Sequence, residues 1–157
     1  MAEEKTNVMR ILDKAKIKYK HYSYDGDSTT TGTQVAEMLN QNPGQVFKTL
    51  VTIGKSKSYY VFVVPVEKEL NLKLAAISVG EKSIEMIKSK DLLSVTGYIH
   101  GGCSPIGMKK RYKITIDTQA EEFDTIIFSA GKIGSQVQIS LEDLRKVVDF
   151  QIALIAE

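Results

Sequence analysis

The stretch VFKTLVTIGKSKSYYVFVVPV, from Val46 to Val66, predicts the β-hairpin on which the fold is built. Residues 46–53 and 59–66 are rich in β-branched and aromatic side chains, and the polar link GKSKS between them is typical of a hairpin connection. The second run is apolar almost throughout, as expected of a strand whose two faces are both buried. We therefore expect this second strand to lie inside the protein.

Short helices and further strands surround this hairpin. Helical spacing and capping residues predict helices over 6–17, 33–39, 72–79 and 141–148, with Thr6 or Asn7, Thr33, Asn71 and Ser140 as their N-caps. Short helical turns are predicted at 83–87 and 91–95. Strands are predicted at 19–24, 97–100, 113–117, 125–129, 137–140 and 150–155. Because strands and helices do not alternate regularly, the pattern indicates an α+β fold with a mixed sheet, in one domain over residues 1–157.

Composition and charge are typical of a soluble globular protein. Apolar residues make up 43% of the chain and charged residues 25%, and no run approaches the roughly 20 apolar residues that span a bilayer. The net charge of +2 is too small for a protein that coats nucleic acid, so an RNA partner would be held by a local patch. The N-terminus lacks the apolar core of a signal peptide, and the single cysteine, Cys103, excludes an internal disulfide. We expect a cytoplasmic protein with no membrane partner.

The stretch GYIHGGCSPIGMKKR, from Gly97 to Arg111, is the first candidate for a functional site. Its paired glycines, Gly101 and Gly102, allow close approach to main-chain N–H groups, and successive N–H groups can form an anion-binding concavity. The basic run at 109–111 beside them suits phosphate. A tight turn followed by a solvated run of charge explains the same residues equally well.

Two single residues are further candidates. Lys48 lies inside the predicted strand VFKTL, and a lysine is costly to bury without a partner. It either reaches solvent from an edge strand or lines a cleft, where its amine would bind a phosphate or polarise a carbonyl. Cys103 is either a small packed residue or a nucleophile, and neither His21 nor His100 lies at a diagnostic spacing from it.

A second loop of small residues, SAGKIG from Ser129 to Gly134, follows another predicted strand. It is either an ordinary turn or the opposite lip of a cleft shared with the Gly101 loop. The sequence contains no HExxH, CxxC, Walker or GxGxxG motif, so neither a metal nor a nucleotide cofactor is predicted.

Six motifs together resemble one protein family. KTNVMRILD, VFKTLV, VPVEKELNLKLAA, GEKSIEMI, GYIHGGCSPIGMKK and SAGKIG come in the order seen in the bacterial YbaK family of Cys-tRNA(Pro) deacylases, which is related to the editing domain of prolyl-tRNA synthetases. The resemblance runs from Lys5 to about Leu144. It implies a compact α+β domain with a mixed, mostly antiparallel, barrel-like sheet core flanked by short helices. It also implies hydrolysis of a wrongly attached amino acid from a tRNA 3′ end, without a metal or a catalytic triad.

The resemblance further implies which residues form the site. Lys48 matches the family's indispensable lysine, and the N–H groups around Gly101 and Gly102 would stabilise an oxyanion. The substrate would be bound by a set of pocket residues: Tyr22, Thr31, Thr49, Ser104, Pro105, Ser129, Gly131 and Gln136. The acceptor-stem backbone would be contacted by three basic residues: Lys109, Lys110 and Arg111. The nucleophile would come from the substrate, as a cysteinyl thiol or a ribose hydroxyl.

Two departures from the family pattern keep the substrate open. Thr31 stands where relatives often carry an aromatic residue, and Gln136 where some carry an acidic one. The hypotheses are editing of Cys-tRNA(Pro), editing of another small amino acid such as alanine, and binding of tRNA or a synthetase without turnover. A thiol hydrolase that uses Cys103 is a fourth. Prolyl-tRNA synthetase is an expected partner by resemblance only.

Overall fold

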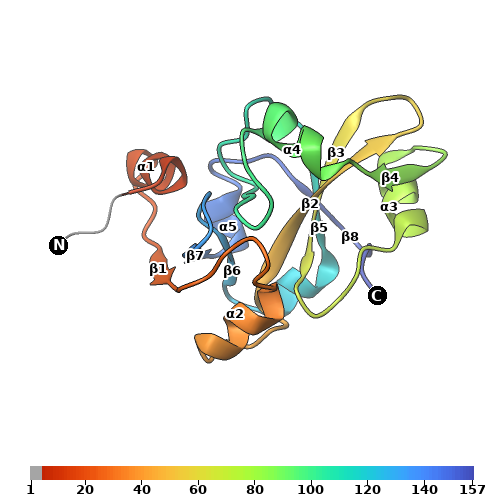
Figure 1. Cartoon of the computed structure of the whole chain (residues 1–157). Coiled ribbons are helices and arrows are strands. Elements are labelled where there is room, and N and C mark those ends of the chain that lie inside the picture. The colour runs from red at the N-terminus through yellow and green to blue at the C-terminus, as the bar shows by residue number, and fades with distance from the viewer. Residues whose placement is uncertain (1–4) are drawn as a thin grey trace.

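The computed structural model describes residues 5–157, whose strands form two sheets (Figure 1). The larger sheet has the strand order β4 (Ile84–Met86), β2 (Phe47–Gly54), β3 (Tyr59–Pro65), β5 (Lys113–Asp117), β8 (Gln151–Ala153). The smaller sheet has the order β1 (Lys20–Ser23), β7 (Ser135–Ile139), β6 (Ile126–Ser129). Pairing is antiparallel except between β3 and β5 and between β5 and β8, so the expected mixed, mostly antiparallel arrangement is confirmed.

Five short helices connect or cover these strands. They are α1 (Asn7–Lys14), α2 (Gly32–Met38), α3 (Leu72–Val79), α4 (Ser89–Thr96) and α5 (Leu141–Leu144), and a 3₁₀ turn spans Thr118–Glu122. In Figure 1, α1 lies beside the smaller sheet and α3 lies at the other end of the molecule, beside β4. Within residues 5–157, no helix is long and apolar enough to cross a membrane.

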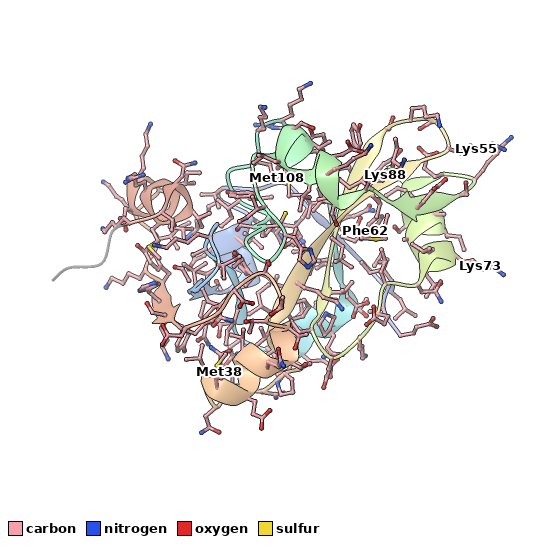
Figure 2. All side chains as sticks on the ribbon, viewed as in Figure 1. Met38, Lys55, Phe62, Lys73, Lys88 and Met108 are labelled. Atoms are coloured by element: carbon pink, nitrogen blue, oxygen red, sulfur yellow. The ribbon has the colours of Figure 1, made fainter. Side chains whose placement is uncertain are left out.

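Strand β3 is the centre of the larger sheet, as the hairpin pattern predicts. Val61 and Val63 point into the main core, which the smaller sheet and α1 complete. Phe62 and Val64 point the other way and pack under α3 (Figure 2 labels Phe62). All four side chains are fully buried, which explains why this strand is a continuous apolar run.

The two sheets are joined by a parallel bridge between Val46 and Ile127. The strands of residues 5–157 do not close into a ring. The barrel-like core implied by the family resemblance is therefore an open arrangement of two sheets. Strand β2 is an edge strand of the larger sheet from Phe47 to Val51, because β4 pairs with it only from Thr52 onward.

Two predicted elements are wrong. Residues 84–86 were expected to be helical but form β4, because they pair with the exposed edge of β2. Residues 97–100 were expected to form a strand but continue from the end of α4, where Gly97 adopts φ 86° and Tyr98 N donates to the hydroxyl of Thr96. That local cap satisfies the main chain without a partner strand.

Helix boundaries differ less. The N-cap of α2 is Thr31 and not Thr33, because Thr31 and Gln34 form a reciprocal capping box. Helix α5 ends at Leu144, four residues earlier than expected. Helix α3 begins after the Asn71 cap and ends at Gly80, as predicted.

Candidate active site

Three of the predicted pocket residues form a row across the smaller sheet. Tyr22 on β1 lies opposite Gln136 on β7, and Gln136 lies opposite Ser129 on β6. Directly opposed residues of antiparallel strands project from the same face of a sheet, so the three side chains are neighbours. Their assignment came from separate stretches of sequence, and the strand register brings them together.

Lys48 extends this row across the bridge between the sheets. The bridge joins Val46 and Ile127 in parallel, and Lys48 and Ser129 each follow two residues later. Because side chains alternate along a strand, Lys48 and Ser129 project from the same side as the bridged pair. Lys48 and Ser129 therefore lie at equivalent positions of β2 and β6, on the face of both strands that points away from the main core. We call Tyr22, Gln136, Ser129 and Lys48 the cross-strand row.

The amine of Lys48 is partly shielded. Its side chain is 30% exposed and lies between two apolar clusters, one around Val46 and one around Val64. Its Nζ lies 3.6 Å from Oε1 of Glu69, whose side chain is 84% exposed. An ion pair with so exposed a partner is weak, so the amine can exchange this carboxylate for another anion.

The side chain of Thr49 does not lie beside the cross-strand row. It points to the opposite face of β2, toward the main core, where its hydroxyl oxygen is buried without a hydrogen-bond partner. Sequence alternation already predicted that Lys48 and Thr49 point in opposite directions. The family resemblance placed both in the pocket, but their side chains lie on different sides of the strand.

The glycine loop, Gly101 to Gly107, packs against the serine loop, Ser129 to Gly134. A Cβ atom at Gly102 would lie 3.1 Å from the Cα of Lys132 and 3.1 Å from the backbone nitrogen of Ile133. Gly101 has φ 87°, and a Cβ there would lie 3.3 Å from Cγ1 of Ile133. The two glycine-bearing loops therefore pack directly against each other.

The segment before α2 links the glycine loop to the Lys48 side of β2. A Cβ at Gly101 would lie 4.0 Å from the Cα of Ser28. Four residues later, a Cβ at Gly32 would overlap Val66, which projects from the same side of the hairpin as Lys48. Residues 28–32 thus form a wall that runs from the paired glycines to the neighbourhood of the amine.

The two glycine amides are not equivalent. Gly102 N donates to the carbonyl of Ile99 at 3.0 Å, so this N–H is already used in a turn. Within residues 5–157, the structure gives no such partner to the N–H of Gly101, which is also the more exposed of the two. The expectation of two bare amides is corrected to one, and Gly102 is there because only a glycine fits against Lys132.

Gln41 is a neighbour of the row that the sequence did not reveal. Its Nε2 donates to Oε1 of Gln136 at 2.9 Å, and its own Oε1 is buried without a partner. This contact fixes the side chain of Gln136 and turns its amide nitrogen away from Gln41. The hydroxyl of Tyr22 donates a hydrogen bond to Oε1 of Gln138. Ser129 Oγ accepts one from Gly131 N at 3.1 Å.

The remaining predicted pocket residues have structural roles. The Thr31 hydroxyl caps α2. Ser104 is fully buried and its Oγ accepts from Ile106 N, while Pro105 is buried beside it. Gly131, with φ 101°, lies against Tyr98 and Val8, on the side of α1. Of these residues, Gly131 reaches the row only through the N–H that it donates to Ser129 Oγ.

Cys103 lies in the main core and is poorly suited to nucleophilic attack. Burial raises the pKa of its thiol to about 12, so the thiolate is scarce at neutral pH. Within the described residues, no three His, Cys, Asp or Glu side chains are grouped closely enough to hold a metal ion.

Comparison with known proteins places this geometry in a family. The model of the aminoacyl-tRNA editing domain matches residues 27–147, which include the whole row except Tyr22. An Enterococcus faecalis protein that bears the name Cys-tRNA(Pro)/Cys-tRNA(Cys) deacylase EbsC is 41% identical over 152 residues, which cover 96% of this chain and 93% of that protein. A proline–tRNA ligase of Thermosipho africanus is 31% identical over 80 residues, 51% of this chain and 14% of the ligase.

The fold comparison agrees with the sequence comparisons. A crystal structure described as a trans-editing enzyme for prolyl-tRNA synthetase superposes with a TM-score of 0.83 at 21% identity, over 98% of this chain and 99% of that one. At this identity the match concerns the fold alone, while the family model and the E. faecalis relative carry the assignment. The chain belongs to the aminoacyl-tRNA editing domain family.

Proposed function

We propose that this protein is a cytoplasmic trans-editing deacylase that hydrolyses the ester bond of mischarged Cys-tRNA(Pro). The observation that carries the proposal is the alignment of Lys48 on β2 with Ser129 on β6 across the bridge, with the glycine loop packed against the loop that begins at Ser129. Family membership and the E. faecalis relative support the reaction class and the tRNA substrate. The partial match to a proline–tRNA ligase supports a synthetase partner.

Lys48 is the residue proposed to hold negative charge in this site. Its side chain projects from β2, which pairs along its length with β3, and its amine has only a weak carboxylate partner in Glu69. The terminal phosphate of the tRNA, or the oxyanion that forms as the ester is attacked, would replace that carboxylate. A preorganised cation in partly apolar surroundings stabilises such charge better than water does, because it needs no reorganisation.

The Gly101 amide is the proposed second donor to the oxyanion. Gly101 is an exposed residue whose N–H is given no backbone partner within residues 5–157, whereas the N–H of Gly102 donates to Ile99. Ser129 accepts a bond from Gly131, which leaves its own hydroxyl hydrogen to donate to the substrate. Gln136, held by Gln41, presents its amide nitrogen as a donor. Lys48, Ser129 and Gln136 would thus supply donors, which suit the ester and ribose oxygens of a tRNA 3′ end.

The attacking group belongs to the substrate in this proposal. Cys103 is buried as a thiol, and the row contains no histidine or carboxylate to act as a base. The cysteinyl thiol would attack its own ester carbonyl, so that a C–S bond forms while the bond from the carbonyl to the ester oxygen breaks. The thiol proton passes to the ester oxygen, which leaves on the ribose as a hydroxyl, and water then opens the cyclic thioester to free cysteine. In the alternative route the free ribose hydroxyl would accept a proton from a water as that water attacks the carbonyl, and the ester oxygen leaves as a hydroxyl with a proton in return. The protein's contribution is to hold these groups in place.

A second candidate is editing of another small amino acid. It is favoured by Gln136, whose amide stands where some relatives have an acid, because an amide donor binds a different substrate group from a carboxylate. A panel of tRNA(Pro) charged with cysteine, alanine or proline tests both candidates. Release of cysteine fastest supports the first, and release of alanine fastest supports the second. An unchanged ester half-life at saturating protein, with tRNA still bound, would contradict both and favour a binding module.

A further inference from the structure

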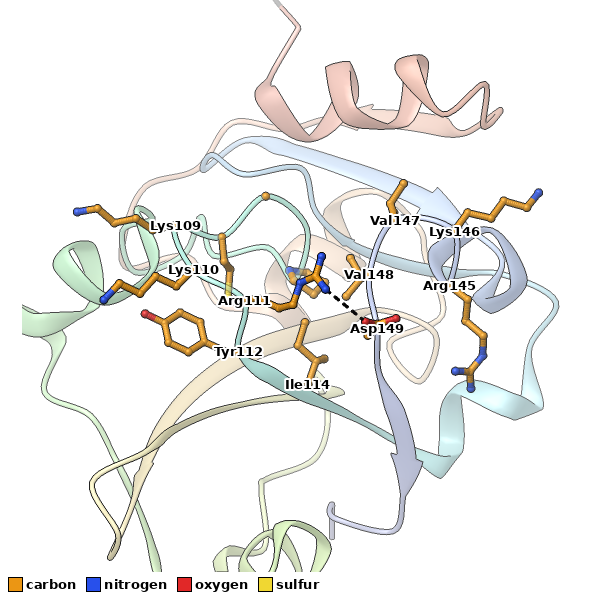
Figure 3. A pocket seen from close by; sticks show the side chains of 13 residues that line it. Lys109, Lys110, Arg111, Tyr112, Ile114, Arg145, Lys146, Val147, Val148 and Asp149 are labelled. Carbon is orange, nitrogen blue, oxygen red and sulfur yellow. Dashed lines mark ion pairs between the residues drawn. The ribbon is translucent and has the colours of Figure 1, made fainter.

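A groove of about 350 Å³ lies at the far end of the glycine loop (Figure 3). Gly101 and Gly102 at the start of this loop contact the serine loop, whereas Pro105 and Gly107 at its end line the groove. Ile114 and Val148 give the groove an apolar floor. The glycine loop is therefore a wall shared by the candidate active site and this second hollow.

The rims of the groove concentrate the positive charge of the protein. Figure 3 shows Lys109 and Lys110 along one rim and Arg145 and Lys146 along the other, with Arg111 between them. These residues form what we call the basic groove. The lining has five cations and one acid, Asp149, and Lys146 also pairs with Asp143 outside the lining at 2.8 Å, whereas the whole chain carries a net charge of only +2. The charge is thus local, as expected of a patch that recognises one part of an anionic partner.

The one acid in the groove does not neutralise it. Arg111 Nη1 lies 3.9 Å from Asp149 Oδ2, and both side chains are about 90% exposed. A pair so long and so exposed contributes little, so a phosphate can take the place of the carboxylate. Lys109 and Lys110 are both exposed, and no ion pair is described for either in residues 5–157.

The opposite rim is partly preorganised. The guanidinium of Arg145 lies 4.1 Å above the ring of Phe150, and its Nη1 donates to the Phe150 carbonyl at 3.1 Å. These two contacts fix the plane of the guanidinium and leave other N–H groups for a ligand. A fixed, planar fork of donors matches the oxygens of a phosphate.

We propose that the basic groove binds the phosphodiester backbone of the tRNA acceptor stem, while the 3′ end passes over the glycine loop to the cross-strand row. This inference rests on the proposed function and adds to it a docking site with two rims, the second of which comes from α5 and the segment after it. A helical RNA is recognised mostly through its phosphates and hydroxyls, which suits exposed cations on two sides of an open groove. The shared loop makes the two sites adjacent.

The test is binding of uncharged tRNA(Pro) transcript at several salt concentrations, which does not depend on catalysis. The double variant Lys109→Ala/Lys110→Ala is compared with Lys55→Ala/Lys73→Ala, which removes the same charge from exposed residues well away from Met108 of the groove (Figure 2). We expect the groove variant to raise the Kd about tenfold and to lower the salt slope by about two, with no change for the control pair. Adding Lys146→Ala should raise the Kd further.

A short CCA-ended single strand, which lacks a stem, completes the design. Its Kd should be the same for the groove variant and the wild type. Equal losses in both double variants, or no loss in the groove variant, would overturn the proposal, and the second result would leave an acidic protein surface as the alternative occupant. If the wild type deacylates no tRNA but its tRNA binding still depends on the groove, the proposed activity fails and the docking site stands.

Discussion

Lys48 and the basic groove use positive charge in two different ways. Lys48 is a single amine, 30% exposed, set between apolar clusters on β2. The groove has five exposed cations, three on the loop before β5 and two directly after α5. The effect of one shielded charge depends on its position. Exposed charges are each screened by salt, so their contribution to binding depends on how many of them there are.

This difference indicates that the two regions contribute to different steps with the same tRNA, Lys48 to catalysis and the basic groove to binding affinity. A tRNA has dozens of phosphates but one reacting ester, so most of its binding can come from exposed contacts that carry no chemistry. Interactions that are made only in the transition state must come from the few groups at the ester. We therefore expect changes at Lys48 to affect kcat and changes in the groove to affect KM, and the predictions below test that division.

The largest expected effect is that of Lys48→Ala. Removing the cation that faces the developing oxyanion should lower kcat for deacylation by about 10²- to 10³-fold, the range typical of a lost electrostatic donor. The free energy of unfolding should change by less than about 1 kcal/mol, because the pair with Glu69 is weak. Single-turnover deacylation and urea unfolding measure the two quantities, and Lys55→Ala is the matched control.

A loss confined to KM would contradict the division between the two sites. In that case Lys48 would be one more phosphate contact, no different in kind from the cations of the groove.

Gly102→Ala tests the loop that separates the two regions and should have an intermediate effect. The new methyl group would lie 3.1 Å from backbone atoms of Lys132 and Ile133, which cannot move as a side chain does. We expect about 1–3 kcal/mol of destabilisation and a fall in kcat of about tenfold, because the glycine loop and the serine loop must move apart. Stem-dependent tRNA binding should persist.

The comparison variant is Gly80→Ala, at the end of α3. Gly80 has φ 73°, and no atom lies within 4 Å of the position that a Cβ would take there, so the cost of the substitution is conformational and about 1 kcal/mol. Its activity should equal that of the wild type. If both variants lose the same activity, the glycine loop has no special part in the reaction.

Elements whose signals are local were predictable from the sequence. The β2–β3 hairpin and helix α3 follow from periodicity and from the Asn71 and Gly80 caps, all within about 20 residues. Strand β4 was missed because its three residues are extended only through pairing with β2, which lies some 30 residues earlier. The secondary structure of such a segment is determined by a partner strand elsewhere in the chain and not by its own sequence.

The candidate site was predictable in its members but not in its arrangement. Tyr22, Gln136 and Ser129 become neighbours through strand register, and Lys48 joins them through one bridge between sheets, neither of which is visible in a sequence. Gln41 was missed because nothing in NQNPG distinguishes a buried amide from a loop residue. The second rim of the groove was missed for the same reason, since α5 and the glycine loop are distant in the chain.

The smallest effect on activity is expected at Cys103, which belongs to neither charged region. Cys103→Ala should keep the deacylation rate within about twofold, because the thiol is buried in the core and not directed at the substrate. Losing the buried sulfur should cost about 1 kcal/mol of stability. A folded but inactive variant would support the hypothesis of a thiol hydrolase with Cys103 as its nucleophile, and would contradict a nucleophile supplied by the substrate.

The pH dependence of stability gives an independent check on the same residue. Burial raises the pKa of the Cys103 thiol from 9.0 to about 12, so between these values the unfolded chain releases a proton that the folded chain keeps. Fewer protons bound in the unfolded state mean that the free energy of unfolding falls as pH rises from about 9 toward 12. Burial also raises the pKa of Tyr98 to about 12, so part of this fall should remain in Cys103→Ala. Urea unfolding at pH 8, 9.5 and 10.5 should show a shallower fall for the variant, and identical slopes would mean that the thiol is more accessible than its place in the core indicates.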